Sequence, residues 1–136
     1  MNLNFLFSIA ELGSKALPIL IAILFFGLII FVHEFGHFIF AKLFGVKVNE
    51  FALGMGPTII KKQGKETKYA IRLFPVGGFV SMEGEEEESG DERAFCNQAV
   101  WKRMIIIAAG ATFNLIMGVI ACIILVAAPW EKPQEN

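Results

Sequence analysis

The sequence predicts an α-helical integral membrane protein, with two transmembrane helices joined by a membrane-associated β-hairpin or small sheet on the cytoplasmic side. Three observations predict this class: apolar stretches near residues 16–40 and 104–128, a β-type pattern between them, and an HExxH motif inside the first stretch. Each stretch holds the roughly 20 mostly apolar residues that a hydrocarbon core of about 30 Å requires. Hydrophobic residues make up 55% of the 136, and the net charge of −1 gives no support for nucleic-acid binding.

The first transmembrane helix is expected over residues 16–44, after an extracytoplasmic lead-in at residues 1–15. Pro18 lies near the start of this helix, where proline is tolerated best, and Gly45 is placed to end it. Every residue from 16 to 32 is apolar, Gly or Pro. This apolar core is too long for a cleavable signal peptide, and no small-x-small cleavage site follows it.

The HExxH motif consists of His33, Glu34 and His37 near the end of the first span. A spacing of four places both histidines on one face of a helix, where they can share a zinc ion while the glutamate acts on metal-bound water. These are the only two histidines of the chain. The alternative is a set of ordinary buried polar side chains. Ionisable residues at membrane depth are rare and functional by default, so we favour the metal site.

A β-rich cytoplasmic loop is expected over residues 45–93. Residues 46–51 alternate as in a strand, residues 58–62 and 67–74 flank a turn, and residues 79–82 form another short strand. We therefore predict a sheet of three or four strands against the membrane face. Six apolar side chains are expected to enter the lipid or the protein core: Phe51, Leu53, Met55, Phe74, Val76 and Phe79.

An acidic run follows at residues 83–93, an interfacial segment at 94–103, and the second transmembrane helix at 104–128. The acidic run could bind a divalent cation, but a solvated loop is the more common outcome and is favoured. Residues 110–114 are small and polar within an otherwise apolar helix, which predicts close packing on the first span. A second possibility is that Asn114 lines the metal site. An extracytoplasmic tail occupies residues 129–136.

The orientation follows from the basic residues. Ten of the twelve lie between the two spans, while Lys15 precedes the first and Lys132 follows the second. By the positive-inside rule the loop is cytoplasmic, so the chain is a multi-pass protein of the cell membrane with its N-terminus outside. Cys96 and Cys122 then lie at different depths, which makes a disulfide between them implausible.

In order along the chain, these motifs resemble the site-2 protease family of intramembrane zinc metalloproteases, in particular the bacterial branch that contains the sigma-E protease. The matching segments are HEFGHFIFAK, then FALGMGP, FPVGGFV, FxNQxxWKR and AGATFN. HExxH alone is shared by unrelated zinc enzymes, whereas the ordered set is specific. The resemblance covers the N-terminal part of such a protease.

The resemblance implies hydrolysis of a peptide bond in or near a substrate's transmembrane helix, often to release a membrane-held regulator. His33 and His37 would bind zinc and Glu34 would be the general base. The sheet would contact the substrate, possible contacts being Phe74, Gly77, Gly78, Phe79 and Asn114. Adding an extended substrate strand to the sheet edge would unwind the helix for cleavage. A sheet that only caps the cytoplasmic side is an equal alternative.

The family takes its third zinc ligand from an Asp on a later transmembrane helix, usually after a PDZ domain, and this sequence has no matching motif. Glu50 and Asp91 could substitute only if the loop folded back. Three interpretations remain: the N-terminal piece of a complete protease, which we favour, a non-catalytic membrane-embedded binding or regulatory module, and a metal-handling membrane protein.

Overall fold

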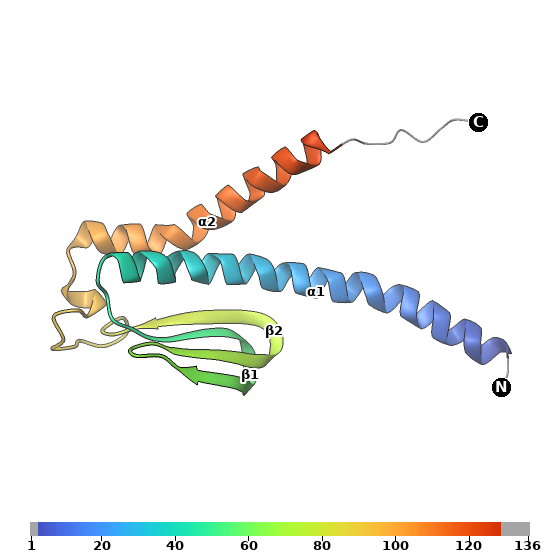
Figure 1. The fold of residues 1–136 in the computed structure, drawn as a ribbon, viewed down its shortest axis with the longest axis horizontal. Helices are drawn as coiled ribbons and strands as arrows, with labels where there is room; N and C mark the ends of the chain where they lie inside the picture. The colour runs from blue at the N-terminus through green and yellow to red at the C-terminus, as the bar shows by residue number, and fades with distance from the viewer. Residues whose placement is uncertain (1–2, 129–136) are drawn as a thin grey trace.

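The computed structural model describes residues 3–128, with side chains from Ser14 onward. The elements are helix α1 (Leu3–Leu43), strands β1 (Val48–Gln63) and β2 (Lys68–Met82), the short helix η1 (Phe95–Asn97) and helix α2 (Val100–Ala127) (Figure 1). The expected tail at 129–136 lies outside the described residues. Both helices are longer than expected: α1 extends into the expected lead-in, and α2 begins within the expected interfacial segment. Neither extension contains a proline, and the only glycine in them is Gly13.

Helix α1 ends in a glycine cap at its predicted position. Gly45 adopts a φ of +78°, and the next amide, of Val46, donates a hydrogen bond to the carbonyl of Ala41 at 2.9 Å. This bond and the one from Gly45 to Lys42 satisfy carbonyls that the helix leaves unpaired. Ala41 and Val46 are both fully buried. The cap therefore directs the chain from the helix straight into β1.

The sheet is built from two long antiparallel strands, each sharply bent near its middle. Because of the bends, Phe51 of β1 pairs with β2 twice, opposite Val80 and opposite Tyr69. The segments around residues 48–53, 58–63, 68–72 and 78–82 thus lie side by side as four short strands would. This agrees with the predicted sheet of three or four strands, except that the chain passes through each bend without leaving the ladder.

The bends lie beside the middle of α1. Gly54 and Gly77 both have a φ of +86°, a conformation that side chains rarely adopt. At the second bend, a Cβ on Gly27 of α1 would lie only 2.5 Å from the carbonyl oxygen of Pro75. Gly27 precedes the helix end by 16 residues, which corresponds to about 24 Å along the axis. The bends therefore reach far along the apolar part of α1.

The two helices touch along the C-terminal part of α1 and diverge toward its N-terminal part (Figure 1). A Cβ on Gly36 would lie 2.7 Å from the carbonyl oxygen of Ala109, so the backbones meet closely there. Near the C-terminal end of α1, a small core of buried side chains lies between the two helices and the sheet. It contains Ala41, Val46, Val48, Val80, Met82 and Ile106.

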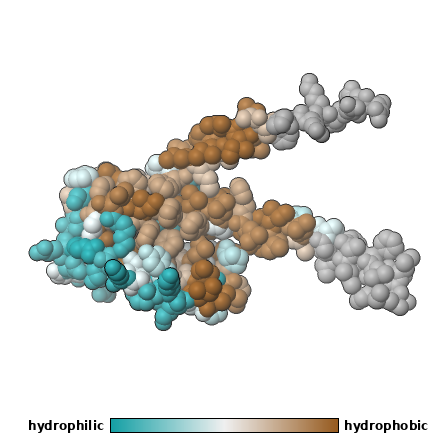
Figure 2. Space-filling view, in the orientation of Figure 1, coloured by the Kyte–Doolittle hydropathy of each residue, from teal (hydrophilic) through white to brown (hydrophobic). Residues whose placement is uncertain are grey.

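Outside the crossing, the helices carry exposed apolar surface (Figure 2). Segments Ser14–Leu43 and Val100–Ala127 are long and apolar enough to cross a membrane, and their most apolar windows are only 0% and 11% buried. The core helix of a soluble protein would be mostly buried. Length, composition and exposure therefore all agree with the predicted spans.

Candidate active site

His33 and His37 lie one turn apart on the face of α1 that meets α2. Their ring centroids are 4.8 Å apart and the rings are nearly perpendicular, at 80°. Nδ1 of His37 lies 2.7 Å from the carbonyl oxygen of Ile106 in α2. A carbonyl only accepts, so Nδ1 carries the proton and Nε2 keeps its lone pair. His37 is thereby held in the tautomer that can bind a metal through Nε2.

His33 is held in a similar way by Asn114, also from α2. Nδ1 of His33 lies 3.3 Å from the Asn114 amide group, whose Oδ1 is buried without a partner. The two ends of an amide have the same shape and are assigned from their hydrogen bonds. We assign Oδ1 toward His33, where it accepts the Nδ1 proton. This assignment satisfies the buried oxygen and leaves Nε2 of His33 as an acceptor.

Gly110 of α2 keeps open the space that both histidines face. A Cβ at this position would lie 2.5 Å from Nε2 of His37 and 2.8 Å from Nε2 of His33. The two nitrogens therefore converge on one point at the surface of α2, and only a residue without a side chain leaves that point clear. The convergence of two imidazole acceptors fits a zinc ion.

The side chain of Glu34 lies against the sheet. Its Cγ lies 3.5 Å from the position that a Cβ on Gly78 would take. The side chains of the HExxH motif therefore contact two different elements. The histidines contact α2, whereas the glutamate contacts the 78–82 segment of β2.

Of the expected substrate-contacting residues, Gly78 lies beside Glu34 and Asn114 lies beside His33. Phe79, next to Gly78, packs under the guanidinium of Arg72 at 5.0 Å. Phe74 and Gly77 belong to the bends, where they contact Gly56 and Met55 respectively. The structure therefore brings two of the five residues to the motif.

The described residues contain no group of three His, Cys, Asp or Glu side chains arranged to hold a metal ion. Glu50 instead pairs with Lys68 and Arg72 in the sheet, and Asp91 pairs with Lys47. In the structure both carboxylates are therefore engaged by basic side chains of the sheet and loop.

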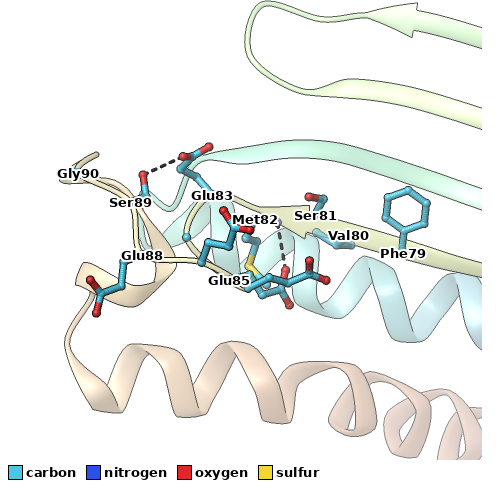
Figure 3. A pocket seen from close by; sticks show the side chains of 12 residues that line it. Phe79, Val80, Ser81, Met82, Glu83, Glu85, Glu88, Ser89 and Gly90 are labelled. Carbon is cyan, nitrogen blue, oxygen red and sulfur yellow. Dashed lines mark hydrogen bonds between the residues drawn. The ribbon is translucent and has the colours of Figure 1, made fainter.

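The acidic run forms one wall of an open cavity of about 780 Å³ beside the end of β2 (Figure 3). Glu83 accepts a hydrogen bond from Ser89, and Glu85 accepts one from the Met82 amide at 3.2 Å. The pKa of Glu83 is lowered by hydrogen bonds from Asn49 and Ser89 and by the charge of Lys47. Glu83 and Glu85 therefore have hydrogen-bond partners within the protein, as is typical of an ordered polar loop.

Ion pairs fix the β1–β2 turn to the C-terminal end of α1. Glu66 of the turn binds both Lys42 of α1 and Arg93 of the loop before α2. Hydrogen bonds from Arg93 and then Lys42 lower the pKa of Glu66 to about 2. Thr67 of the same turn is buried and donates to the Val48 carbonyl at 2.8 Å. The turn therefore lies beside the C-terminal end of α1, whereas the bends lie nearer the middle of this helix.

Two features of the site were not anticipated from the sequence: the Ile106 carbonyl as partner of His37, and the clearance at Gly110. A backbone carbonyl leaves no mark on side-chain identity. Gly110 did carry a signal, since a glycine four residues before an asparagine places both on one helix face. That signal predicted packing, but not packing against the histidines themselves.

Comparison with known proteins identifies the class. Residues 21–134 match the profile of peptidase family M50, the site-2 protease family, and the chain belongs to this family. A protein of Clostridium acetobutylicum, provisionally named a zinc metalloprotease, is 52% identical over 107 residues. A similarly named protein of Fusobacterium nucleatum is 46% identical over 101 residues, and an Enterococcus faecalis protein provisionally named a protease is 55% identical over 67.

The first two matches cover most of this chain, and all three cover a minor part of the relative. The first two alignments span 78% and 74% of the chain, against 32% and 30% of the relative. The third spans 48% of the chain and 16% of the relative. The chain therefore corresponds to about a third of the length of the first two relatives.

Proposed function

We propose that this chain is the HExxH-bearing part of an intramembrane zinc protease that cleaves peptide bonds in or near the transmembrane helices of other proteins. Membership of peptidase family M50 supports proteolysis. The observation that carries the proposal is the convergence of Nε2 of His33 and Nε2 of His37 on the clearance above Gly110.

His33 and His37 would hold the zinc ion, oriented by Asn114 and the Ile106 carbonyl. A bound zinc would acidify a water molecule and polarise the scissile carbonyl. Glu34 is the residue placed to take a proton on the side of the sheet and to return it to the leaving amine. Its separation from the ligand face lets it act as a base without competing for the metal.

The third ligand would come from outside these residues, on a later helix that follows one or more PDZ domains. A catalytic zinc site typically has three protein ligands and one open position. The relatives extend well beyond the aligned third, which leaves room for such a segment. Intact mass of the protein isolated from its source membrane through an N-terminal tag tests this part. A mass well above 15.1 kDa is expected, whereas a mass of 15.1 kDa would contradict it.

In the membrane, Ser14–Leu43 and Val100–Ala127 would be the two spans, with the sheet on the cytoplasmic side of the cell membrane. The bends would then enter the bilayer beside Gly27. Open sheet edges are not stable in lipid and require protein or a water-filled cavity around them. A sheet edge in such a cavity, next to Glu34, is suited to receive an unwound substrate strand at Gly78 and Phe79.

The test is cleavage of a membrane-anchored reporter by the protein in proteoliposomes. Glu34→Gln is expected to abolish cleavage and to leave the bound zinc unchanged, because the amide cannot take a proton but does not disturb the histidines. Undiminished cleavage by this variant would exclude Glu34 as the base.

A second candidate is a membrane-embedded binding or regulatory module that does not cleave. Among the side chains that the structure describes, residues 14–128, no third ligand joins the two histidines, which is the observation that favours this module. Reporter binding that is equal in the wild type and in Glu34→Gln, without cleavage in either, would support this module over the protease.

A further inference from the structure

We propose that the β1–β2 turn and the adjoining apolar groove bind an anionic phospholipid, with the headgroup on Lys62 and Lys65 and an acyl chain in the groove, while Lys61 adds positive charge from the opposite face of the strand. This inference depends on the membrane placement proposed above and is independent of the catalytic role.

The first observation is a contrast among the basic side chains around the sheet. Five of them reach a carboxylate in the structure, namely Lys42, Lys47, Lys68, Arg72 and Arg93. Within the described part of the chain, Lys61, Lys62 and Lys65 have no such partner, and all three are exposed. The one acid in the turn, Glu66, is already engaged by Lys42 and Arg93. Three positive charges at one turn are therefore left to an external anion.

The second observation is an apolar groove of about 340 Å³ that includes Lys62 among its lining residues. Lys62 lies at its rim, and Phe31 of α1 lines its opposite wall. The other lining residues come from the sheet: Phe51, Leu53, Ile60, Tyr69, Ala70 and Ile71. Phe31, Phe51 and Tyr69 form a connected aromatic group, with centroid separations of 6.1 and 6.5 Å.

The cationic and apolar parts of the groove follow the same order as the headgroup and the acyl chain of a phospholipid. Lys62 pairs across the hairpin with Tyr69, and Ile60 pairs with Ile71, farther from the turn. In a strand, residues 60 and 62 point to the same face. The groove is thus cationic at the turn, which lies level with the end of α1, and apolar toward the bends. A headgroup phosphate at the membrane interface would meet the cationic part, and the acyl chain, deeper in the bilayer, would meet the apolar part.

An anionic lipid fits better than a free anion or a neutral lipid. A free phosphate would make no use of Ile60, Ile71 and Phe31, and phosphatidylcholine would gain little from three lysines. Basic residues near an anionic leaflet each contribute about 1 kcal/mol, which corresponds to about fivefold in affinity.

The experiment uses the protein reconstituted in nanodiscs that contain equal amounts of dioleoyl phosphatidylglycerol and dioleoyl phosphatidylcholine. Native mass spectrometry then measures which lipid the released protein retains. We expect at least about tenfold preference for phosphatidylglycerol, lost in a triple variant with Lys61→Gln, Lys62→Gln and Lys65→Gln. The charge-preserving triple arginine variant should keep the preference, and so should the control Lys47→Gln, which removes a lysine that already pairs with a carboxylate.

Equal retention of both lipids by the wild type, or an unchanged preference in the triple glutamine variant, would overturn the proposal. So would full competition by glycerol 3-phosphate, which carries the charge without an acyl chain. Zinc content is measured on the same samples. Lost lipid preference with unchanged zinc content then separates this site from the proposed active site.

Discussion

The two sides of α1 around its motif are built differently. On one side, His33 and His37 face α2, where a backbone carbonyl, an asparagine and the clearance at Gly110 fix both rings. Glu34, by contrast, lies against β2, where its close neighbour is Gly78. The ligand side is a helix–helix contact with few degrees of freedom. The Glu34 side adjoins the sheet segment that we propose receives the substrate.

Substitutions in α2 and in β2, the two elements that contact the motif, should therefore have different consequences. Changes in α2 should act on metal binding, and changes in β2 should act on turnover with the metal retained. The following predictions test whether these two effects can be separated.

The largest effect is expected for Gly110→Ala. The added Cβ would meet both Nε2 atoms at 2.5 and 2.8 Å, so the rings must move or the helices must separate. A displacement of about 1 Å at a reacting centre can cost about a hundredfold in rate. We expect zinc affinity and cleavage to fall together by about this factor, measured by zinc titration and reporter cleavage. The control is Gly118→Ala on the same helix, where a Cβ meets no atom within 4 Å. Normal zinc binding by Gly110→Ala would contradict the ligand geometry.

The next effect is expected for Asn114→Ala, which removes the partner of His33 Nδ1. Loss of such an orienting partner typically costs 10–100-fold in metal affinity. Zinc titration of the purified protein should show this loss. Asn114→Asp should restore much of the affinity, because a carboxylate also accepts the Nδ1 proton. An alanine variant with unchanged zinc affinity would show that the contact does not orient His33.

A smaller and different effect is expected for Gly78→Val. A side chain here would crowd the Ala52 carbonyl at 3.0 Å and approach Glu34 at 3.5 Å. We expect reporter cleavage to fall by about tenfold, while zinc content stays at the wild-type value. Loss of zinc in this variant would contradict the separation between the two sides of α1.

The smallest effect concerns Glu66, whose pKa of about 2 in the folded protein lies below its ordinary value of 4.5. A lowered pKa gives stability that is complete above pH 4.5 and is lost as the pH falls toward 2. Because the ion pairs are partly exposed, Glu66→Gln should cost less than about 1 kcal/mol. Hydrogen exchange of the β1–β2 turn at pH 7 should show slightly faster opening in this variant, and the difference should shrink on acidification. An equal difference at pH 7 and at pH 3 would contradict the role of these ion pairs.

Much of the fold could be predicted because its signals are local. The apolar lengths of both spans, the HExxH spacing, the Gly45 cap and the four β segments can each be recognised within a short window. The pairing of Phe51 with both Val80 and Tyr69 could not, because it depends on glycine bends that bring distant segments together. The partners of the histidines were also hidden. Ile106 acts through its backbone, and the register between α1 and α2 is set by the Gly36 contact rather than by any local pattern.

The most direct test is the zinc content of the protein isolated from its native membrane, measured by elemental mass spectrometry on the wild type, Glu34→Gln and the double variant His33→Ala/His37→Ala. We predict one zinc per chain in the first two and none in the double variant. Zinc retained by the double variant, or lost from Glu34→Gln, would contradict the assignment of the histidines to the metal and of the glutamate to the opposite side.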